Sequence, residues 1–485
     1  MDTTKTPFTP SAELIAMLSS TMTEQQIESL IAMGSEAIKF ALLTLQAKLA
    51  EALNANAQGR PSPSTPSGSV APYLKPESKT STKAKRGARP NHRGARRPAV
   101  PPDKTVDCTI DVCPECGGKL TTCRSKSSSH THCVTDIASD KATETTEHVC
   151  HKGYCPRCKK VFEPKVSEAT PRCSLGNKIS ALSAWLHYSG GCTVHQVLDL
   201  LNYHLSTPLT EGGLMQIWAR LAEIFKPWYD EIQDVCNRSG VLHGDETGWR
   251  VDGKLEWLWC FTTQNETYYF IVNSRGSDAI KRFFNNDWTG VLVSDFWNAY
   301  NHVEGGKAQK CLVHLLRELK RVENYKSTND NWATFKETLK TLLQDAIQLK
   351  RDKAIVPLET YVSSRNELER RLDRLLDFQS ENVEVKRLVK RLRKYRASLL
   401  TFLYHDEVPF DNNHAERNIR PAVLMRKNSY GNQSQNGAEI QSILMSVFRT
   451  LRQRKLPPLE TLQKALRTFI LTDKLPSLAE FEAES

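Results

Sequence analysis

The spacing of apolar residues predicts a long helix near the start of the chain. Between residues 23 and 53 apolar side chains recur at helical intervals, and Thr23 with Gln26 fits a capping box. The pattern predicts one amphipathic helix over residues 23–53, inside a helical region at 1–58. Its apolar stripe has little local core to cover it, so the helix either dimerises or packs on a later domain.

A second helical pattern covers residues 169–238. Three helical units at 179–188, 194–201 and 211–225 are separated by Gly190-Gly191 and by residues 206–209. Their spacing is that of a DNA-binding helix-turn-helix, and any small helical bundle would show the same spacing.

From residue 240 the apolar period changes to two. This predicts a core of strands and helices in the order β-β-β-α-β-α-β-α, typical of a ribonuclease-H-like fold. In that order the first and fourth strands are neighbours, so we expect Asp245 and Asp295 to lie side by side. The predicted strands are 241–243, 255–262, 267–272, 291–293 and 310–313, with a helix at 277–284 and another through residue 321.

The rest of the chain is predicted to be helical. The first part of the core covers 239–325, a helical insertion covers 326–404, and the last part of the core covers 405–455. A helical tail at 456–485 follows, so the fold class is multidomain α+β. The insertion carries a cationic run that either contacts DNA phosphates or forms a solvated helix face: Lys386, Arg387, Lys390, Arg391, Arg393, Lys394 and Arg396.

The composition predicts a polyanionic partner. The 485 residues carry a net charge of +11 with a pI near 9.0, which favours nucleic acid. No apolar stretch approaches a membrane span and no secretory signal is evident, so we expect a cytoplasmic protein that acts on DNA. Thirteen cysteines in such a chain favour reduced thiols and metal ligation over disulfides.

A basic linker covers residues 59–105. It begins with a Pro/Ser/Gly-rich segment and ends in cations without an intervening acid. Such a run is either a solvated, disordered segment or an arm that contacts DNA phosphates, and we favour the arm. The cations are Lys83, Lys85, Arg86, Arg89, Arg93, Arg96 and Arg97.

Residues 106–168 predict a zinc ribbon. Two Cys-x-x-Cys knuckles, Cys113/Cys116 and Cys155/Cys158, each have proline after the first cysteine. Two knuckles close one tetrahedral Zn²⁺ site, and a matched pair is better explained by one structural metal than by two redox dithiols. The 38 residues between them exceed the usual ribbon hairpin and hold further candidates for a second site or a replaced ligand: Cys123, His130, His132, Cys133, His148 and Cys150.

Three carboxylates carry the candidate chemistry. Asp245 and Asp295 follow apolar strands, and Glu416 lies in the segment 411–421, which opens like a helix. Glu416 has Arg417 and Arg420 beside it, and alone would be read as a surface ion pair. Three such acids instead favour a Mg²⁺ site for phosphoryl transfer on nucleic acid.

The other charged residues and the Cys-x-x-His segment near the three acids are interpreted one by one. Arg417, Arg420, Arg426 and Lys427 are predicted to hold DNA phosphates. Glu246 is interpreted as a surface carboxylate on the strand face opposite Asp245, Asp252 as a turn carboxylate, and Asp411 as a helix cap. Cys311 and His314 form a Cys-x-x-His segment that we interpret as packing rather than metal ligation.

At these residues the chain resembles transposases of the insertion-sequence-66 family, members of the DDE superfamily. The similarity covers the Cys-Pro-x-Cys knuckles, Gly244–Thr247, Asp295–Tyr300, the segment 311–317, and 411–421 with Arg426–Ser429. It implies DNA transposition with a catalytic triad of Asp245, Asp295 and Glu416 that holds two Mg²⁺ ions, which Mn²⁺ can replace. It also implies element ends and target DNA as substrates, a homodimer or larger assembly on DNA, and small accessory proteins encoded by the same element.

Two departures and two competing functions accompany the resemblance. Phe296-Trp297 stands where many relatives have a small turn with glycine, and leucines stand in the segment 311–317 where relatives have Ala and Arg. The competing functions are a DNA-binding domesticated relative without catalysis and a ribonuclease-H-type nuclease without strand transfer. A dimerising helix and a zinc ribbon favour the transposase, since both serve to find and pair DNA ends.

Overall fold

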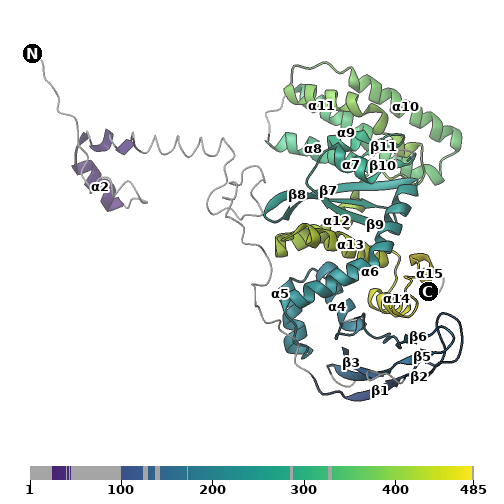
Figure 1. The fold of residues 1–485 in the computed structure, drawn as a ribbon. Helices are drawn as coiled ribbons and strands as arrows, with labels where there is room; N and C mark the ends of the chain where they lie inside the picture. The colour runs from purple at the N-terminus through teal and green to yellow at the C-terminus, as the bar shows by residue number, and fades with distance from the viewer. Residues whose placement is uncertain are drawn as a thin grey trace, which may run out of the picture. The chain divides into compact units, whose positions relative to one another are not determined.

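The computed structural model describes residues 24–44 and 100–482, without 36, 40, 43, 124–128, 137–141, 172, 285–287 and 326–329 (Figure 1). The chain forms two units, Met1–Gly87 and Ala88–Ser485, which are described separately. No helix in the described part is long and apolar enough to cross a membrane.

The N-terminal unit corrects the prediction of one long helix. Helix α2 (Glu24–Ala32) ends at a turn, and helical residues resume at position 35. Gly34 lies between them with φ +89°, a left-handed conformation that breaks the helix and that glycine adopts without strain. Thr23, the start of the expected capping box, and the cationic arm at 83–97 lie outside the described residues.

The cysteine-rich region consists of two small sheets. One has the order β1-β4-β3 and the other β2-β5-β6. The long spacer between the knuckles is explained by β3 and β4, which pair as an antiparallel hairpin and form most of the first sheet. The strands are β1 (Lys104–Cys108), β2 (Thr121–Thr122), β3 (Ser129–Asp136), β4 (Glu144–His151), β5 (Gly153–Cys155) and β6 (Lys160–Phe162).

The helices expected over residues 169–238 are present, and the last is longer than predicted. Helix α6 (Glu211–Arg238) continues through Pro227 and packs along α13 (Gln435–Gln453) and β9 (Thr267–Val272). Its buried face contains Trp218, Phe225 and Trp228, so the helix is anchored in the main core. The preceding elements are α4 (Asn177–Tyr188), α5 (Val194–Asp199) and the π-helical turn η3 (Leu200–His204).

The central sheet has five strands in the order β11-β10-β7-β8-β9. Strands β7, β8 and β9 are antiparallel, whereas β10 runs parallel to both β7 and β11. The first and fourth predicted strands are therefore neighbours, as expected. The strands are β7 (Val241–Val251), β8 (Lys254–Thr262), β9 (Thr267–Val272), β10 (Val291–Ser294) and β11 (Lys307–Lys310).

The fifth strand was predicted at the wrong position. It covers Lys307–Lys310, and the apolar residues expected to form it begin α8 (Leu312–Tyr325) instead. The strand itself is polar, and its buried Gln309 and Lys310 are satisfied by polar partners rather than by an apolar pattern. A hydrophobic pattern therefore could not locate it.

Helices cover the two faces of the sheet. Phe283 of α7 (Ser277–Phe283) stacks on Phe261 and Phe270, whereas α12 packs on β7 and β8 and α13 on β9. The connection between α12 and α13 turns at Gly431, where φ is +115° and a Cβ would lie 2.2 Å from the Arg250 carbonyl oxygen. The C-terminal helices are α12 (Asn413–Ser429), α13 (Gln435–Gln453), α14 (Pro458–Thr472) and α15 (Leu478–Glu482).

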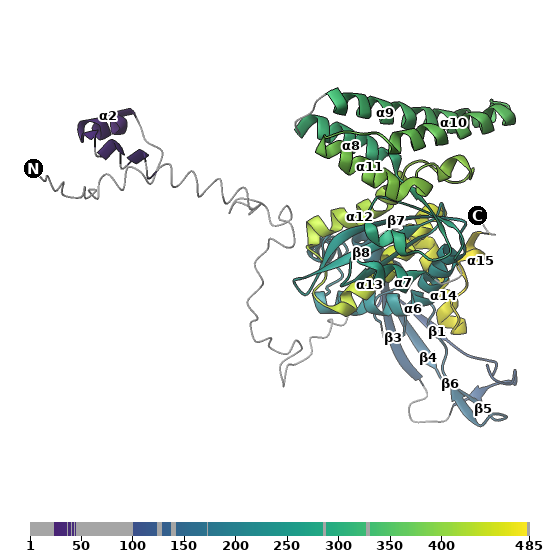
Figure 2. The ribbon, with the colours of Figure 1, turned by 90° about the horizontal axis from the view of Figure 1, so that it is seen from above.

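The segment between the second and third acids is helical and has its own core. Trp332, Phe335 and Leu388 belong to a buried cluster that also includes Val291 and Val293 of β10. Both views show α8 to α11 gathered as one group (Figures 1 and 2). The helices are α9 (Asp330–Arg351), α10 (Leu358–Leu376) and α11 (Val383–Tyr395), with short turns η5 (Asp352–Ala354), η6 (Arg396–Ser398) and η7 (Thr401–Leu403).

Candidate active site and metal centres

Asp245 and Asp295 lie at corresponding positions on neighbouring parallel strands. The β7–β10 register pairs His243 with Val293, and each aspartate follows its strand residue by two positions. Asp245 accepts a hydrogen bond from the Glu246 N–H (2.9 Å), and Asp295 accepts one from the Trp297 N–H (2.8 Å). The sheet topology therefore brings the two acids to the same edge, as predicted.

The N-terminus of α12 brings Glu416 to this edge. Asn412, buried just before the helix, donates to the Gly244 carbonyl oxygen (2.8 Å), and its Oδ1 lies 3.2 Å from His243 Nδ1. Asp411 accepts from the Asn413 N–H (3.1 Å), so it caps the helix as expected. The side chain of Asn412, the formal N-cap residue, makes no capping bond and joins α12 to β7 instead.

The three acids share one electrostatic environment. Burial, together with the charges of Glu246, Asp295 and Glu416, raises the pKa of Asp245 to about 8. Glu416 Oε1 is buried and has no hydrogen-bond partner among the described residues. Anionic groups that repel one another in a partly buried position are well suited to hold a cation.

Glu246 was wrongly predicted to be a surface carboxylate. It is on the opposite strand face from Asp245, as expected, but its side chain is only 2% exposed. Its Oε1 accepts from Nε and Nη2 of Arg275 at 3.0 and 2.7 Å, and its Oε2 accepts from the Tyr300 hydroxyl. The α7–η4 side of the sheet buries it, where η4 is Asn298–His302.

The departure at Phe296-Trp297 has a structural role. The Arg275 guanidinium lies between two indole rings, 3.7 Å from the ring centroid of Trp297 and 4.5 Å from that of Trp257. The Trp297 indole N–H donates to the Arg275 carbonyl oxygen (2.9 Å). Since the Trp297 backbone also donates to Asp295, this cation–π stack fixes the loop that holds the second acid.

Lys310 is a buried cation that sequence reasoning missed. It is fully buried, donates to Ser294 Oγ (3.0 Å), and lies over the rings of Tyr300 and Tyr395. Burial lowers the pKa of Lys310 to about 8, while the nearby Asp295 opposes this shift. A lysine at the end of a polar strand gave no signal that would separate it from a surface cation.

A groove of about 590 Å³ opens beside the acids. It is lined by Asp245 and Glu416 together with Arg417, Arg420 and Lys427 of α12. Arg426 is placed differently from the prediction, because its guanidinium donates to Thr247 Oγ1 (2.9 Å) and to the Gly248 carbonyl oxygen. It therefore ties α12 to β7, and it does not line the groove.

The four knuckle cysteines converge as predicted. The sulfur atoms of Cys113, Cys116, Cys155 and Cys158 all lie within 4.8 Å of one another, with Sγ–Sγ distances of 3.6 and 3.7 Å for two pairs. The Cys158 N–H donates to Cys155 Sγ (3.3 Å), an arrangement that stabilises a thiolate. This cluster could bind a metal such as zinc.

The other cysteines and histidines of this region stay outside the cluster. Within the described part of the cysteine-rich region, Cys108 Sγ and His148 Nδ1 form a mixed pair 3.7 Å apart.

Among the described residues, one further set brings three ligand atoms equally close, and it consists of Cys311, His314 and Glu416. The expectation that Cys311 and His314 only pack is therefore too simple, because both approach the third acid.

Comparison with known proteins assigns the chain to a family. The sequence profile described as Transposase IS66 family matches residues 172–440, which include the three acids and the α12 cations. The chain belongs to the IS66 transposase family. The cysteine-rich region lies before the matched segment.

A distant relative is similar to part of the chain. The chain is 22% identical over 240 residues to the uncharacterized protein y4qI of Sinorhizobium fredii, a match covering 43% of each chain. The chain thus spans less than half of that relative's length.

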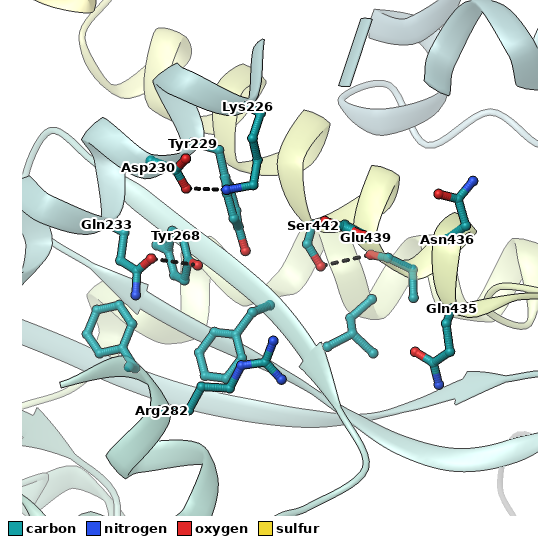
Figure 3. Close-up of a pocket in the computed structure, with 14 residues that line it drawn as sticks. Lys226, Tyr229, Asp230, Gln233, Tyr268, Arg282, Gln435, Asn436, Glu439 and Ser442 are labelled. Carbon is teal, nitrogen blue, oxygen red and sulfur yellow. Dashed lines mark hydrogen bonds and ion pairs between the residues drawn. The ribbon is translucent and has the colours of Figure 1, made fainter. Parts of the chain in front are cut away.

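This IS66-family chain also has a hollow away from the acids. It has a volume of about 640 Å³ and lies beside β9, between α6, α7 and α13 (Figure 3). Its lining includes Arg282, Gln435 and Lys226, which is already paired with Asp230. Asp245 and Glu416 line the other hollow, so the groove along α12 is the candidate active site.

Proposed function

We propose that this chain is a DNA transposase that cleaves strands at the ends of its insertion sequence and joins them to target DNA. The observation that carries the proposal is that Asp245 and Glu416 line one groove together with cations of α12, while the charges of Asp295 and Glu416 both act on Asp245. The mixed sheet, with its three antiparallel strands followed by two parallel ones, supports a ribonuclease-H-like core.

The acids fit the Mg²⁺ ions that the family implies. All three offer oxygen donors, Glu416 Oε1 is a buried atom without a hydrogen-bond partner among the described residues, and burial, together with repulsion from the neighbouring acids, raises the pKa of Asp245. Asp245, Asp295 and Glu416 would hold the ions, and Mn²⁺ would substitute. When bound, two such ions activate the attacking oxygen and stabilise the leaving one.

The chain's own residues position the DNA. Arg417, Arg420 and Lys427 bind phosphates along α12, while the Arg275–Trp297 stack keeps Asp295 in place. In cleavage, a water oxygen bonds to phosphorus and the bond to the 3′-oxygen breaks, which leaves a 3′-hydroxyl. In joining, that hydroxyl attacks a target phosphorus and displaces a 3′-oxygen there.

In this proposal the cysteine-rich region and the cationic arm help to recognise the ends of the element. Cys113, Cys116, Cys155 and Cys158 hold a structural Zn²⁺ in a zinc ribbon, and the cationic arm with Lys83, Lys85, Arg86 and Arg89 contacts DNA phosphates. Pairing of two element ends calls for a homodimer or larger assembly, with accessory proteins of the same element as partners.

The test is strand cleavage and joining on a plasmid that carries the element's ends, with Mg²⁺ and the products of the neighbouring genes. Asp245→Asn, Asp295→Asn and Glu416→Gln are compared with wild type, with DNA binding measured in parallel. Asp252→Asn is the matched control, because Asp252 occupies the β7–β8 turn in a left-handed conformation that asparagine also adopts.

Loss of both reactions in the three acid variants, with binding and the control intact, supports the proposal. Binding of the ends by wild type without any cleavage would favour the DNA-binding relative without catalysis. Cleavage without joining would favour a nuclease.

A further inference from the structure

A second set of metal-ligand atoms meets at Glu416. Cys311 Sγ, a nitrogen of His314 and a carboxylate oxygen of Glu416 all lie within 4.8 Å of one another. Cys311 follows β11 directly, His314 is in the first turn of α8, and Glu416 is in the first turn of α12. Three elements that are separate in the sequence therefore supply one cluster.

One polar atom of His314 and one of Glu416 lack hydrogen-bond partners among the described residues. His314 Nδ1 and Glu416 Oε1 are both buried atoms without a hydrogen bond to any described residue. His314 Nε2 lies 3.8 Å from Glu416 Oε1, and Arg317 Nη1 lies 3.6 Å from the same oxygen, both too far for hydrogen bonds. Buried polar atoms without partners call for an explanation, and an ion bound by the imidazole and the carboxylate would supply a partner for Glu416 Oε1.

Cys311 is in an environment that suits a thiolate ligand. Its Sγ accepts the Asn412 N–H at 3.3 Å, and it precedes the N-terminus of α8, where the helix dipole favours negative charge. Burial raises the pKa of the Cys311 thiol, and the N–H groups of His314, Asn412 and Val313 oppose only part of this rise. Binding of a metal ion would remove the thiol proton, as it does at other cysteine sites.

We propose that Cys311, His314 and Glu416 form a site for a thiophilic divalent ion of the Zn²⁺ class, and that this ion inhibits the reaction. A donor set of sulfur, nitrogen and oxygen suits Zn²⁺ and leaves a fourth position for water, whereas Mg²⁺ prefers oxygen donors. The inhibition rests on the proposed function, since it requires Glu416 to be shared with the Mg²⁺ site. An ion bound to the thiolate and imidazole would hold Glu416 away from the two aspartates.

The first measurement is the number of zinc ions retained per chain after equilibration with a weak chelator, by elemental analysis of the full-length protein. Wild type is expected to retain about two ions, one at the knuckle cysteines and one at this site. Cys311→Ser and His314→Gln are each expected to retain about one. Cys133→Ser is the control, because Cys133 is an exposed cysteine outside both clusters.

A second readout reports the thiolate directly and does not depend on activity. After Co²⁺ replacement, the sulfur-to-cobalt charge-transfer absorption of wild type should exceed that of Cys311→Ser, because a fifth thiolate contributes to it. Wild type that retains one ion, or variants that match it in ion count and absorption, would overturn the site. In that case His314 and Arg317 act only as charged neighbours of Glu416.

The inhibition is tested by adding Zn²⁺ to the Mg²⁺-dependent cleavage assay, with each protein compared with its own zinc-free rate. Wild type should lose activity at a zinc concentration at least roughly tenfold lower than the concentration that affects Cys311→Ser or His314→Gln. If wild type and the variants are equally sensitive to zinc, Glu416 is not shared between the two sites. The metal site itself is still decided by the number of ions retained. If wild type never cleaves DNA, the proposed function fails, and the ion count still decides the metal site.

Discussion

The two ligand clusters that the sequence suggested are assembled in opposite ways. Each cysteine knuckle is a local turn, in which the Cys113 N–H donates to the Gly118 carbonyl oxygen and the Cys158 N–H donates to Cys155 Sγ. The acid cluster depends on the whole sheet, because Asp245 lies in β7, Asp295 directly follows β10, and Glu416 lies in α12. The cysteine cluster therefore needs little core of its own, whereas the acid cluster exists only when the central fold is complete.

The packing around the two clusters reflects this difference. Around the cysteines the buried apolar residues in the described part of the chain are Cys113, Leu120 and Cys155, with a few partly buried neighbours such as Ile110 and Phe162. The acids are supported by the large core that contains Trp249, Trp259 and Phe261. A small core of this kind gains most of its stability from a bound metal, and a large core does not.

Removal of the metal ligands should have the largest effect, and the effect should stay local. Cys113→Ser is expected to abolish zinc binding at the knuckle cysteines and to unfold the strands β2, β5 and β6, because structural zinc contributes on the order of 10 kcal/mol in small zinc domains. Hydrogen exchange with limited proteolysis measures this, and Cys133→Ser is the control. Unfolding that spreads through β7–β11 would show that the two regions are not independent.

Removal of the cation that pairs with Glu246 behind the acids should have the next largest effect. Arg275→Met leaves the buried Glu246 carboxylate with its bond from the Tyr300 hydroxyl but without its charged partner, so the free energy of unfolding should fall by about 3–5 kcal/mol. Urea denaturation measures the loss, and a double variant with Glu246→Gln should recover part of it. A loss below about 1 kcal/mol would mean that water or another group satisfies Glu246.

The helical layer between the two regions should make the stability of the fold depend on pH. His187 of α4, a helix that contacts both β3 and α13, has its pKa lowered to about 4 by burial. Between pH 6.5 and 4 the unfolded chain binds the proton and the folded chain does not. Stability is therefore full above about pH 6.5 and should fall by about 3 kcal/mol towards pH 4.

Urea denaturation of wild type and His187→Gln across this range checks the prediction. The variant should show a flatter dependence on pH, since glutamine does not titrate. Identical slopes would assign the acid sensitivity to other groups.

Changes in the groove cations should have the smallest effect. Arg420→Gln and Lys427→Gln are each expected to reduce the salt dependence of DNA binding, the slope of log affinity against log salt, by about 1. Lys226→Gln is the control, because Lys226 lines the hollow beside β9. A slope that changes in the control and not in the groove variants would place the DNA elsewhere.

The sequence allowed the acids and the cysteines to be identified for different reasons. The knuckles are readable because ligand spacing within a turn is itself the signal. Asp245 and Asp295 were placed side by side because the strand order makes their strands neighbours, and the structure has this order. Glu416 was grouped with them because three such acids favour a Mg²⁺ site, and the family resemblance added the catalytic triad.

The residues that were misread act through contacts distant in the sequence. Glu246 looks like a surface carboxylate until Arg275 and Tyr300 are folded against it. Lys310 lies in a polar strand that has no apolar period, and its burial depends on Ser294, Tyr300 and Tyr395. The break at Gly34 was overlooked because apolar residues on both sides keep helical spacing.

The most direct test of the central claim is Mn²⁺ binding by the full-length protein, measured by electron paramagnetic resonance. If β7, β10 and α12 build one ion site, Asp245→Asn, Asp295→Asn and Glu416→Gln should each weaken binding by more than roughly tenfold. Asp252→Asn should bind like wild type. Binding that is lost with the aspartates and unchanged by Glu416→Gln would show that α12 contributes no ligand, and would contradict the account.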